Sequence, residues 1–292
     1  QTKSLIPIAA FEGNKGTTED LDRTAKLYIG GKQARPDSGY STAVFAKSGK
    51  LVGHASNASR KDVRNAVEAA NGAKGWSKTT GHLRAQILYF IAENLSARAE
   101  EFADRLDILK GGNSGQKEVK ASISRLFTYA AWADKYDGQV HGVPMRGSAL
   151  AMKEPVGVIA ALCPDTAPLL GLISLMAPAI AMGNRVILSA SEAFPLIATD
   201  FFQVLDTSDI PGGVVNILTG AHIDVAKTMA EHMDISACWS FSGSDLSKEI
   251  EAGSATNIKR TWVNNGHALT PSAKEYLAAA TEVKNIWIPF GE

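Results

Sequence analysis

The sequence predicts an α/β fold in which a parallel sheet is covered by helices on both faces. Between residues 156 and 264, short apolar runs alternate with segments whose apolar residues recur at helical spacing. The apolar runs are nearly continuous, as expected for strands that are buried on both sides. Strands separated by helices imply right-handed crossovers, and ligands of such sheets bind beyond the carboxyl ends of the strands.

The composition indicates a globular chain that needs no cross-link. The 292 residues carry 30 Lys and Arg against 30 Asp and Glu, and 45% of them are hydrophobic. A chain of this size buries roughly 75% of the surface that its unfolded form exposes. The balanced charge argues against nucleic acids and membranes as partners. The two cysteines form no CxxC pair, which argues against structural zinc and favours a reducing, cytoplasmic location.

The amino-terminal part predicts an arm, hairpins and a first helix. Residues 1–26 are polar and lack the apolar region of a secretory signal. The chain does not begin with Met, which suggests processing or a piece of a longer protein. Residues 27–56 alternate apolar runs with glycines, the pattern of small hairpins. Ser59, with Asp62 three residues on, resembles a capping box that starts a helix.

Two further helices and a hairpin are expected before the sheet. One helical stretch is predicted to run without a break over 83–109 and to end at Gly111. Another carries apolar residues at helical spacing over 119–130. Residues 137–155 are rich in Gly and Pro and predict a hairpin.

The second half predicts five strands with helices between them. The strands are expected at 156–162, 185–188, 214–218, 237–241 and 259–264. The helices are expected at 166–183, 196–205, 224–233 and 245–252. The first helix has no charge over eighteen residues, which is nearly enough to span a membrane. Pro168 and Pro178 interrupt it, so a buried helix is the better interpretation.

Five sequence blocks carry a resemblance to a known family. They are EPVGVI at 154–159, APAIAMGN at 177–184, SASE at 189–192, PGGVVNILTG at 211–220 and FSGS at 241–244. In order and spacing they resemble the NAD-binding half of the aldehyde dehydrogenase superfamily. The resemblance implies a Rossmann-like domain formed by 27–136 and 156–266. It also implies a small β oligomerisation flap formed by 137–155 and 276–292.

The resemblance implies oxidation of an aldehyde by NAD(P), with a Cys nucleophile, a Glu base and an Asn that holds the oxyanion. Thr166 stands at the Asn position and Asn264 at the Glu position. Only 26 residues follow Gly266, so the catalytic domain that supplies the nucleophile is expected to be absent. Cys163, at the end of a strand, could replace it. A buried core residue is the preferred interpretation, because no cation or His adjoins this thiol.

The positions that would hold the cofactor are also altered. Gly220 is kept, but His222 and Ala226 replace the next two glycines of the family, and the imidazole fills space that a pyrophosphate needs. Ser189 replaces a Lys that would reach the adenosine ribose. We therefore expect NAD(P) binding that is weak or lost.

Two other positions remain open. Glu192 is either an acceptor for ribose hydroxyls or a solvated loop acid, and Ser244 either meets a phosphate or caps a helix. We expect no metal site. The histidines His222, His232 and His267 are not spaced as ligands, so loop or surface positions are expected for them.

The association surface is expected to survive. Val283, Ile286 and Ile288 lie in a predicted strand, and Trp287 could anchor an interface. The nearest resemblance is to the degenerate C-terminal module of family-16 type, two-module aldehyde dehydrogenases. We expect an inactive module that forms a homo-oligomer, or packs on an active aldehyde dehydrogenase module, through 137–155 and 281–289. The alternatives are an active NAD(P)-dependent oxidoreductase and an NAD sensor without turnover.

Overall fold

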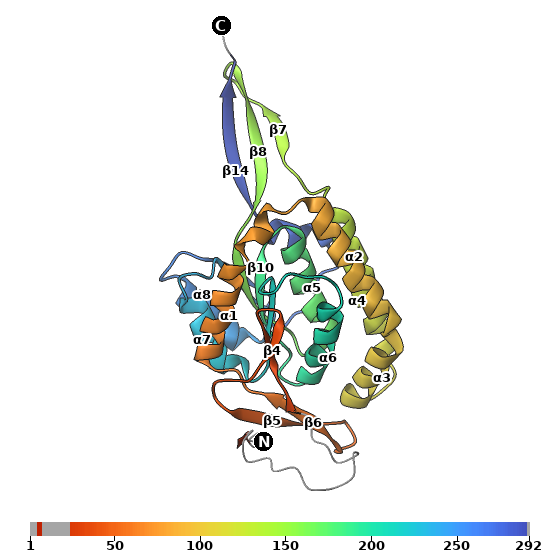
Figure 1. Cartoon of the computed structure of the whole chain (residues 1–292). Coiled ribbons are helices and arrows are strands. Elements are labelled where there is room, and N and C mark those ends of the chain that lie inside the picture. The colour runs from red at the N-terminus through yellow and green to blue at the C-terminus, as the bar shows by residue number, and fades with distance from the viewer. Residues whose placement is uncertain (1–4, 8–23, 291–292) are drawn as a thin grey trace.

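A seven-stranded sheet forms the centre of the computed structural model, which describes residues 5–7 and 24–290 (Figure 1). The strand order is β13-β12-β9-β10-β11-β3-β4. Strands β13 to β11 are parallel, whereas β3 and β4 are antiparallel additions beside β11. This confirms the α/β fold. The strands are β3 (Leu27–Ile29), β4 (Lys32–Ala34), β9 (Val158–Leu162), β10 (Arg185–Ser189), β11 (Val215–Leu218), β12 (Ala237–Ser240) and β13 (Arg260–Val263).

Helices cover both faces of this sheet. On one face lie α1 (Arg60–Gly72), α7 (His222–Glu231) and α8 (Ser244–Ser254) (Figure 1). On the other lie α5 (Pro168–Ala181) and α6 (Pro195–Asp206), and outside them α2 (Gly81–Ala97), α3 (Ala99–Lys110) and α4 (Gly115–Trp132). A short 3₁₀ helix (Lys74–Lys78) follows α1, and α9 (Ala273–Ala279) packs against α5. In the part of the chain that the structure describes, no helix combines the length and apolar character that a membrane crossing requires.

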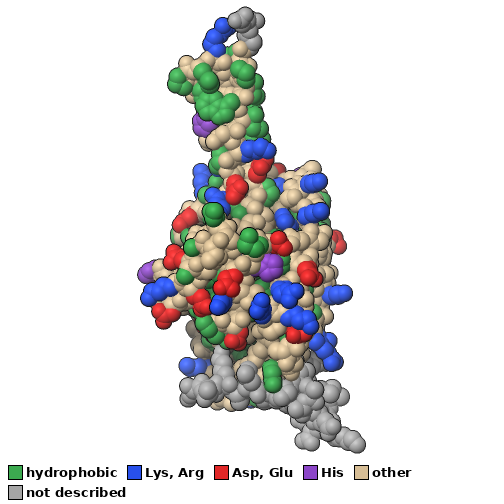
Figure 2. All heavy atoms as spheres, turned by 90° about the vertical axis from the view of Figure 1, so that its left-hand side faces the viewer, with side chains coloured by type: hydrophobic (Ala, Val, Ile, Leu, Met, Phe, Trp, Pro, Cys, Tyr) green, Lys and Arg blue, Asp and Glu red, His purple; other side chains and the backbone are tan. Residues whose placement is uncertain are grey.

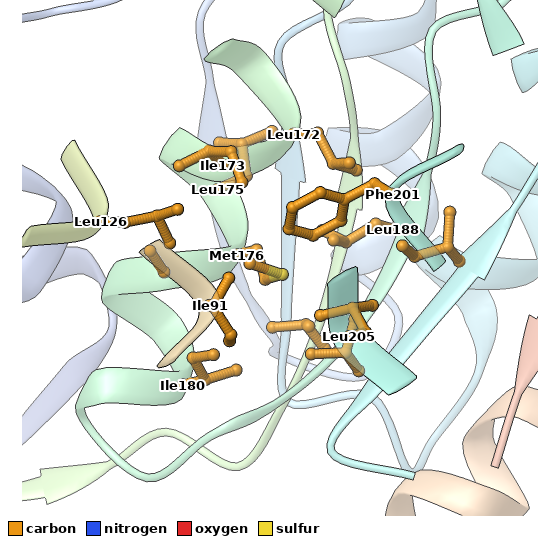
Figure 3. Close-up of a cluster of buried hydrophobic side chains, with 14 of the residues drawn as sticks. Ile91, Leu126, Leu172, Ile173, Leu175, Met176, Ile180, Leu188, Phe201 and Leu205 are labelled. Carbon is orange, nitrogen blue, oxygen red and sulfur yellow. The ribbon is translucent and has the colours of Figure 1, made fainter. Parts of the chain in front are cut away.

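The main core lies between the sheet and the outer helices. Helix α5 is buried nearly all round, which explains why its sequence carries no charge. Figure 3 shows Met176 of α5 among Ile91 of α2, Leu126 of α4, Leu188 of β10 and Phe201 of α6, all buried in one cluster. The predicted buried helix is thus the centre of the hydrophobic core.

The expected start of α1 is observed, but the expected long helix over 83–109 is wrong. Asp62 accepts a hydrogen bond from the Ser59 backbone N–H at 2.8 Å, as a capping box requires. The long stretch is instead divided into α2 and α3 at Arg98, whose ψ of 17° leaves the helical range. Arg98 pairs with Glu101 at 2.7 Å and lies over the Phe102 ring, so the new helix starts with its apolar face on the core.

A second, four-stranded sheet lies below the carboxyl ends of the parallel strands (Figure 1). Its order is β1-β5-β6-β2, with β1 (Leu5–Pro7), β2 (Thr24–Ala25), β5 (Tyr40–Phe45) and β6 (Leu51–Ser56). The predicted arm over 1–26 thus contributes two short strands. The rest of that arm, 1–4 and 8–23, lies outside the described residues.

A three-stranded antiparallel flap projects from the opposite end of the body (Figure 1). It contains β7 (Gln139–Gly142), β8 (Gly147–Pro155) and β14 (Thr281–Pro289), with β8 in the middle. The flap begins later than the expected residue 276, because Tyr276 and Leu277 are fully buried in α9. Strand β8 leads directly into β9, so the flap lies at the amino ends of the parallel strands.

The end of α7 provides a test of helix capping. Lys259 Nζ donates to the carbonyl oxygens of Met229 at 3.1 Å and His232 at 2.6 Å. These carbonyls lack partners within the helix, and a cation at a helix C-terminus is favourable. We expect Lys259→Met to lower the free energy of unfolding by about 2 kcal/mol, measured by urea denaturation. Lys248→Met, on the exposed face of α8, should change it by less than about 0.5 kcal/mol; equal effects would contradict this prediction.

Candidate functional site

The candidate residues lie at the carboxyl edge of the parallel sheet. The loops that follow β9, β10, β11, β12 and β13 meet there, as expected for a doubly wound sheet. This edge is at the end of the body opposite the flap. Among residues 5–7 and 24–290, no group of three or more His, Cys, Asp or Glu side chains is placed to hold a metal ion.

Cys163 directly follows β9 and is fully buried. Its backbone N–H donates to the carbonyl oxygen of Ser189 at 2.9 Å. Burial raises the pKa of its thiol far above the usual range, and the nearby Asp165 raises that pKa further. A thiol that stays protonated is a poor nucleophile. Cys238, inside β12, is also buried, and burial raises the pKa of its thiol to about 11.

Thr166 lies exposed in the loop before α5, and the polar contacts around it are structural. Its carbonyl oxygen accepts a hydrogen bond from Lys110 Nζ at 2.9 Å. The same ammonium pairs with Glu118, whose other carboxylate oxygen accepts from the Leu169 N–H at 2.9 Å. Glu118 therefore caps the amino end of α5. This nearly buried acid was not predictable from the sequence, because one charge in an amphipathic helix carries no distinctive signal.

Asn264 follows β13 and provides no general base. Its backbone N–H donates to the Ser240 carbonyl oxygen at 2.8 Å, which continues the parallel pairing. Its side-chain Oδ1 is buried and has no hydrogen-bond partner within the described part of the chain. A carboxamide oxygen cannot take a proton from water near neutral pH, so this position cannot perform the proton transfer of a carboxylate.

Glu192 and His222 are brought together by the structure. The Glu192 carboxylate accepts a hydrogen bond from the backbone N–H of His222, the first residue of α7. The same carboxylate oxygen lies 3.7 Å from His222 Nδ1. Glu192 is therefore not the solvated loop acid of one expectation, and its carboxylate is directed at a helix rather than outwards.

His222 is 1% exposed, so the expected loop or surface position is wrong for this residue. Its ring Nε2 lies 2.8 Å from the carbonyl oxygen of Ala190, to which it must donate because a carbonyl only accepts. Its Nδ1 lies 3.3 Å from Ser242 Oγ. The burial of His222 could have been predicted from its position shortly after a buried strand, where the family that the sequence resembles has a glycine.

The other expected cofactor positions do not join this group. Ser189 is 1% exposed within β10. Gly220 has φ of +121°, and a Cβ there would lie 3.1 Å from Asn57 Cα. A glycine at this position therefore allows the chain to pass close to the loop that follows β6. Ser244 is exposed at the start of α8, but the residue that caps this helix is Gly243 and no side chain caps it. Of the two alternatives for Ser244, the side-chain cap is not observed.

Asp165 is a further polar residue at this edge, with no role predicted from the sequence. Its carboxylate accepts from Ser191 Oγ at 2.6 Å and from the Ala193 N–H at 3.1 Å. These bonds join the loop after β9 to the loop after β10, which carries Glu192. Asp165 thus positions Glu192 beside α7.

A doubly wound parallel sheet with helices on both faces defines a Rossmann-like α/β module. Its projecting three-stranded flap is an additional feature. Residues 34–268 match the model of the aldehyde dehydrogenase family. The chain therefore belongs to the aldehyde dehydrogenase family.

Individual relatives agree with this membership. An aldehyde dehydrogenase of Agaricus bisporus is 32% identical over 228 residues, which are 75% of this chain and 45% of the relative. The NADP/NAD-dependent aldehyde dehydrogenase PuuC of Escherichia coli is 33% identical over 214 residues, which are 70% of this chain and 43% of that protein. This chain thus spans less than half the length of these two curated relatives.

A solved structure supports the fold. A double-mutant betaine aldehyde dehydrogenase from Staphylococcus aureus, in complex with NAD+, superposes with a TM-score of 0.78. The match covers 82% of this chain and 50% of that chain, at 23% sequence identity. At that identity the likeness shows the fold alone.

The expected cofactor positions at the carboxyl edge make contacts within the chain. The Glu192 carboxylate is engaged by the first N–H of α7, and the imidazole of His222 lies between two loops. Ser189, which replaces the expected Lys, is buried and presents no cation. The side chains of Asp165, Ser191, Glu192 and His222 at this edge are all hydrogen-bonded within the chain.

Proposed function

We propose that this chain is a non-catalytic aldehyde dehydrogenase module that associates through its flap, with copies of itself or with an active aldehyde dehydrogenase module. The observation that carries the proposal is the exposure of apolar side chains on the flap. Figure 2 shows them gathered on the projecting strands, whereas charged side chains of both signs are interspersed over the body. An exposed apolar sheet with unpaired edges favours a protein partner.

Both faces of the flap carry exposed apolar side chains. Val140, Leu150 and Ile286 pair directly across the three strands and so share one face. Val140 is 71% exposed. Trp287 pairs with Ala149 on the opposite face and is 58% exposed. Because Val283 shares the face of Trp287, it lies on the side opposite to Ile286 and Ile288. A partner that covers both faces, or extends the free edge of β14, would bury these side chains.

The altered catalytic positions support the absence of turnover. Cys163 has a buried, protonated thiol, Asn264 offers an amide in place of a carboxylate, and Thr166 is exposed before α5. Removing a general base costs roughly 10² to 10⁴ in rate, and removing an oxyanion donor costs roughly 10² to 10³. Residues 267–280 contain α9 and lead directly into β14, so little chain separates the sheet from the flap.

We also propose that NAD(P) binding is weak or lost, and that the chain works in a reducing, cytoplasmic compartment. Two relatives are named as bound to or dependent on these cofactors, but that property belongs to those proteins. The hydrogen bonds that Glu192 and His222 make within the chain at the carboxyl edge support weak binding here. The two buried cysteines are both free thiols, which supports a reducing location.

The test is a turnover assay on the purified chain. With simple aldehydes and millimolar NAD, we expect no formation of reduced NAD above the protein-free rate, followed by absorbance. Cys163→Ala should give the same trace as the native chain. Turnover that depends on Cys163 would overturn the non-catalytic proposal and support an active oxidoreductase.

A sensor that binds NAD without turnover is the second candidate. The exposed Ser244 and the start of α8, whose N-cap Gly243 has no side chain, favour it, because backbone N–H groups at a helix start can bind a phosphate. Saturable calorimetric binding of NAD to the native chain, without turnover, would support the sensor instead of the structural module.

A further inference from the structure

We propose that Glu192 and His222 act as an internal ligand that occupies the nucleotide crevice of this chain and closes it from within. The inference rests on the proposed function in one respect, since it supplies a cause for weak NAD(P) binding.

The Glu192 carboxylate occupies the place at the start of α7 where the anionic group of a ligand would bind. It accepts from the backbone N–H of His222 at the start of α7, a helix of ten residues. The positive end of a helix dipole and its free N–H groups favour a phosphate or a carboxylate there. With a carboxylate already bound, an incoming phosphate meets a like charge at the same place.

The His222 ring takes the adjoining space. His222 begins α7, and its ring donates to the Ala190 carbonyl oxygen after β10 and has its Nδ1 3.3 Å from the Ser242 hydroxyl after β12. Strands β10 and β12 flank β9 in the sheet. The ring therefore bridges loops on both sides of β9, across the point where the resemblance places the pyrophosphate.

The internal ligand is held by its surroundings. Asp165 accepts from Ser191 Oγ at 2.6 Å and from the Ala193 N–H at 3.1 Å. These bonds fix the loop that carries Glu192 on both sides of that residue. The Glu192 carboxylate is thus positioned on α7 at little entropic cost, whereas a free ligand loses its translational freedom when it binds.

Removing the imidazole should therefore open the crevice. His222→Gly places a small residue at the start of α7 and frees the Ala190 carbonyl oxygen and Ser242 Oγ for a ligand. Glu192→Gln keeps the shape of the side chain and removes its charge. We expect the combined variant to bind NAD and ADP at least tenfold more tightly than the native chain, and each single variant to show part of this gain.

The experiment is isothermal calorimetry on the full chain with NAD and with ADP, supported by thermal denaturation. His232→Gly is the matched control, because it makes the same change at the opposite end of α7. It should leave nucleotide affinity as in the native chain. Should His222→Gly fail to fold, His222→Ser, which keeps a small polar side chain, replaces it in the comparison.

The outcomes separate this inference from the proposed function. A native chain that binds NAD at micromolar concentration would overturn both the internal ligand and the proposal of weak binding. A native chain and opened variants that bind equally weakly would overturn the internal ligand alone. An equal gain in His232→Gly would also overturn it, because the effect would then be unspecific.

Discussion

A chain in which Ile286 is replaced by Lys is expected to behave as a monomer under conditions where the native chain is associated. Ile286 lies in the cross-strand row with Leu150 and Val140, at the centre of one apolar face of the flap. A cation placed in a buried interface without a partner costs about 3 kcal/mol or more. Since 1.4 kcal/mol is a factor of ten, the dissociation constant should rise at least about 100-fold.

Light scattering during size-exclusion chromatography, at several protein concentrations, measures this change. Ile223→Lys is the control, because Ile223 is 58% exposed on α7 and lies away from the flap. The control should keep the native mass. A native chain that is monomeric at every concentration, alone and with an active aldehyde dehydrogenase module, would contradict the association proposal. An assembly unaffected by the Lys would place the interface elsewhere.

The second large effect is expected in the core. Phe201 of α6 is fully buried, lies edge-on to Phe102 of α3 at 6.5 Å between ring centroids, and faces the cluster around α5 (Figure 3). Phe201→Ala should lower the free energy of unfolding by about 4 kcal/mol, because it removes a large apolar side chain and leaves a cavity. That loss is a large part of the stability of a typical domain.

Chemical denaturation monitored by circular dichroism measures the loss. Phe45→Ala, at an exposed position of β5, is the matched control and should change the free energy of unfolding by less than about 1 kcal/mol. A loss below about 2 kcal/mol for Phe201→Ala would mean that α6 and α3 close the cavity.

The strands were predictable because each is a short apolar run buried on both faces. The observed β9 to β13 differ from the expected ranges by two residues or fewer at each end. The break at Arg98 was not predictable, because apolar spacing continues through it from Leu95 to Phe102. The ion pair of Arg98 with Glu101 and the packing of α3 on α6 accompany the break, and both depend on contacts that apolar spacing does not encode.

The candidate site was predictable in place but not in its contacts. The resemblance located Glu192 and His222 at the carboxyl edge, yet their hydrogen bonds depend on side-chain directions in two separate loops. From the sequence alone, a histidine between a strand and a helix is predicted to be exposed, because its hydrogen-bond partners are not known. The same holds for Glu118, which reaches a helix start 51 residues away in the chain.

The opposite positions of the flap and the carboxyl edge have a thermodynamic consequence. They are separated by the length of β9, five residues or roughly 16 Å. Substitutions more than about 10 Å apart without shared partners usually have additive free energies. The effects of Ile286→Lys and His222→Gly should therefore add in the double variant. Ile286→Lys should then weaken self-association and leave nucleotide affinity at its native value. His222→Gly should change nucleotide affinity and leave self-association at its native value.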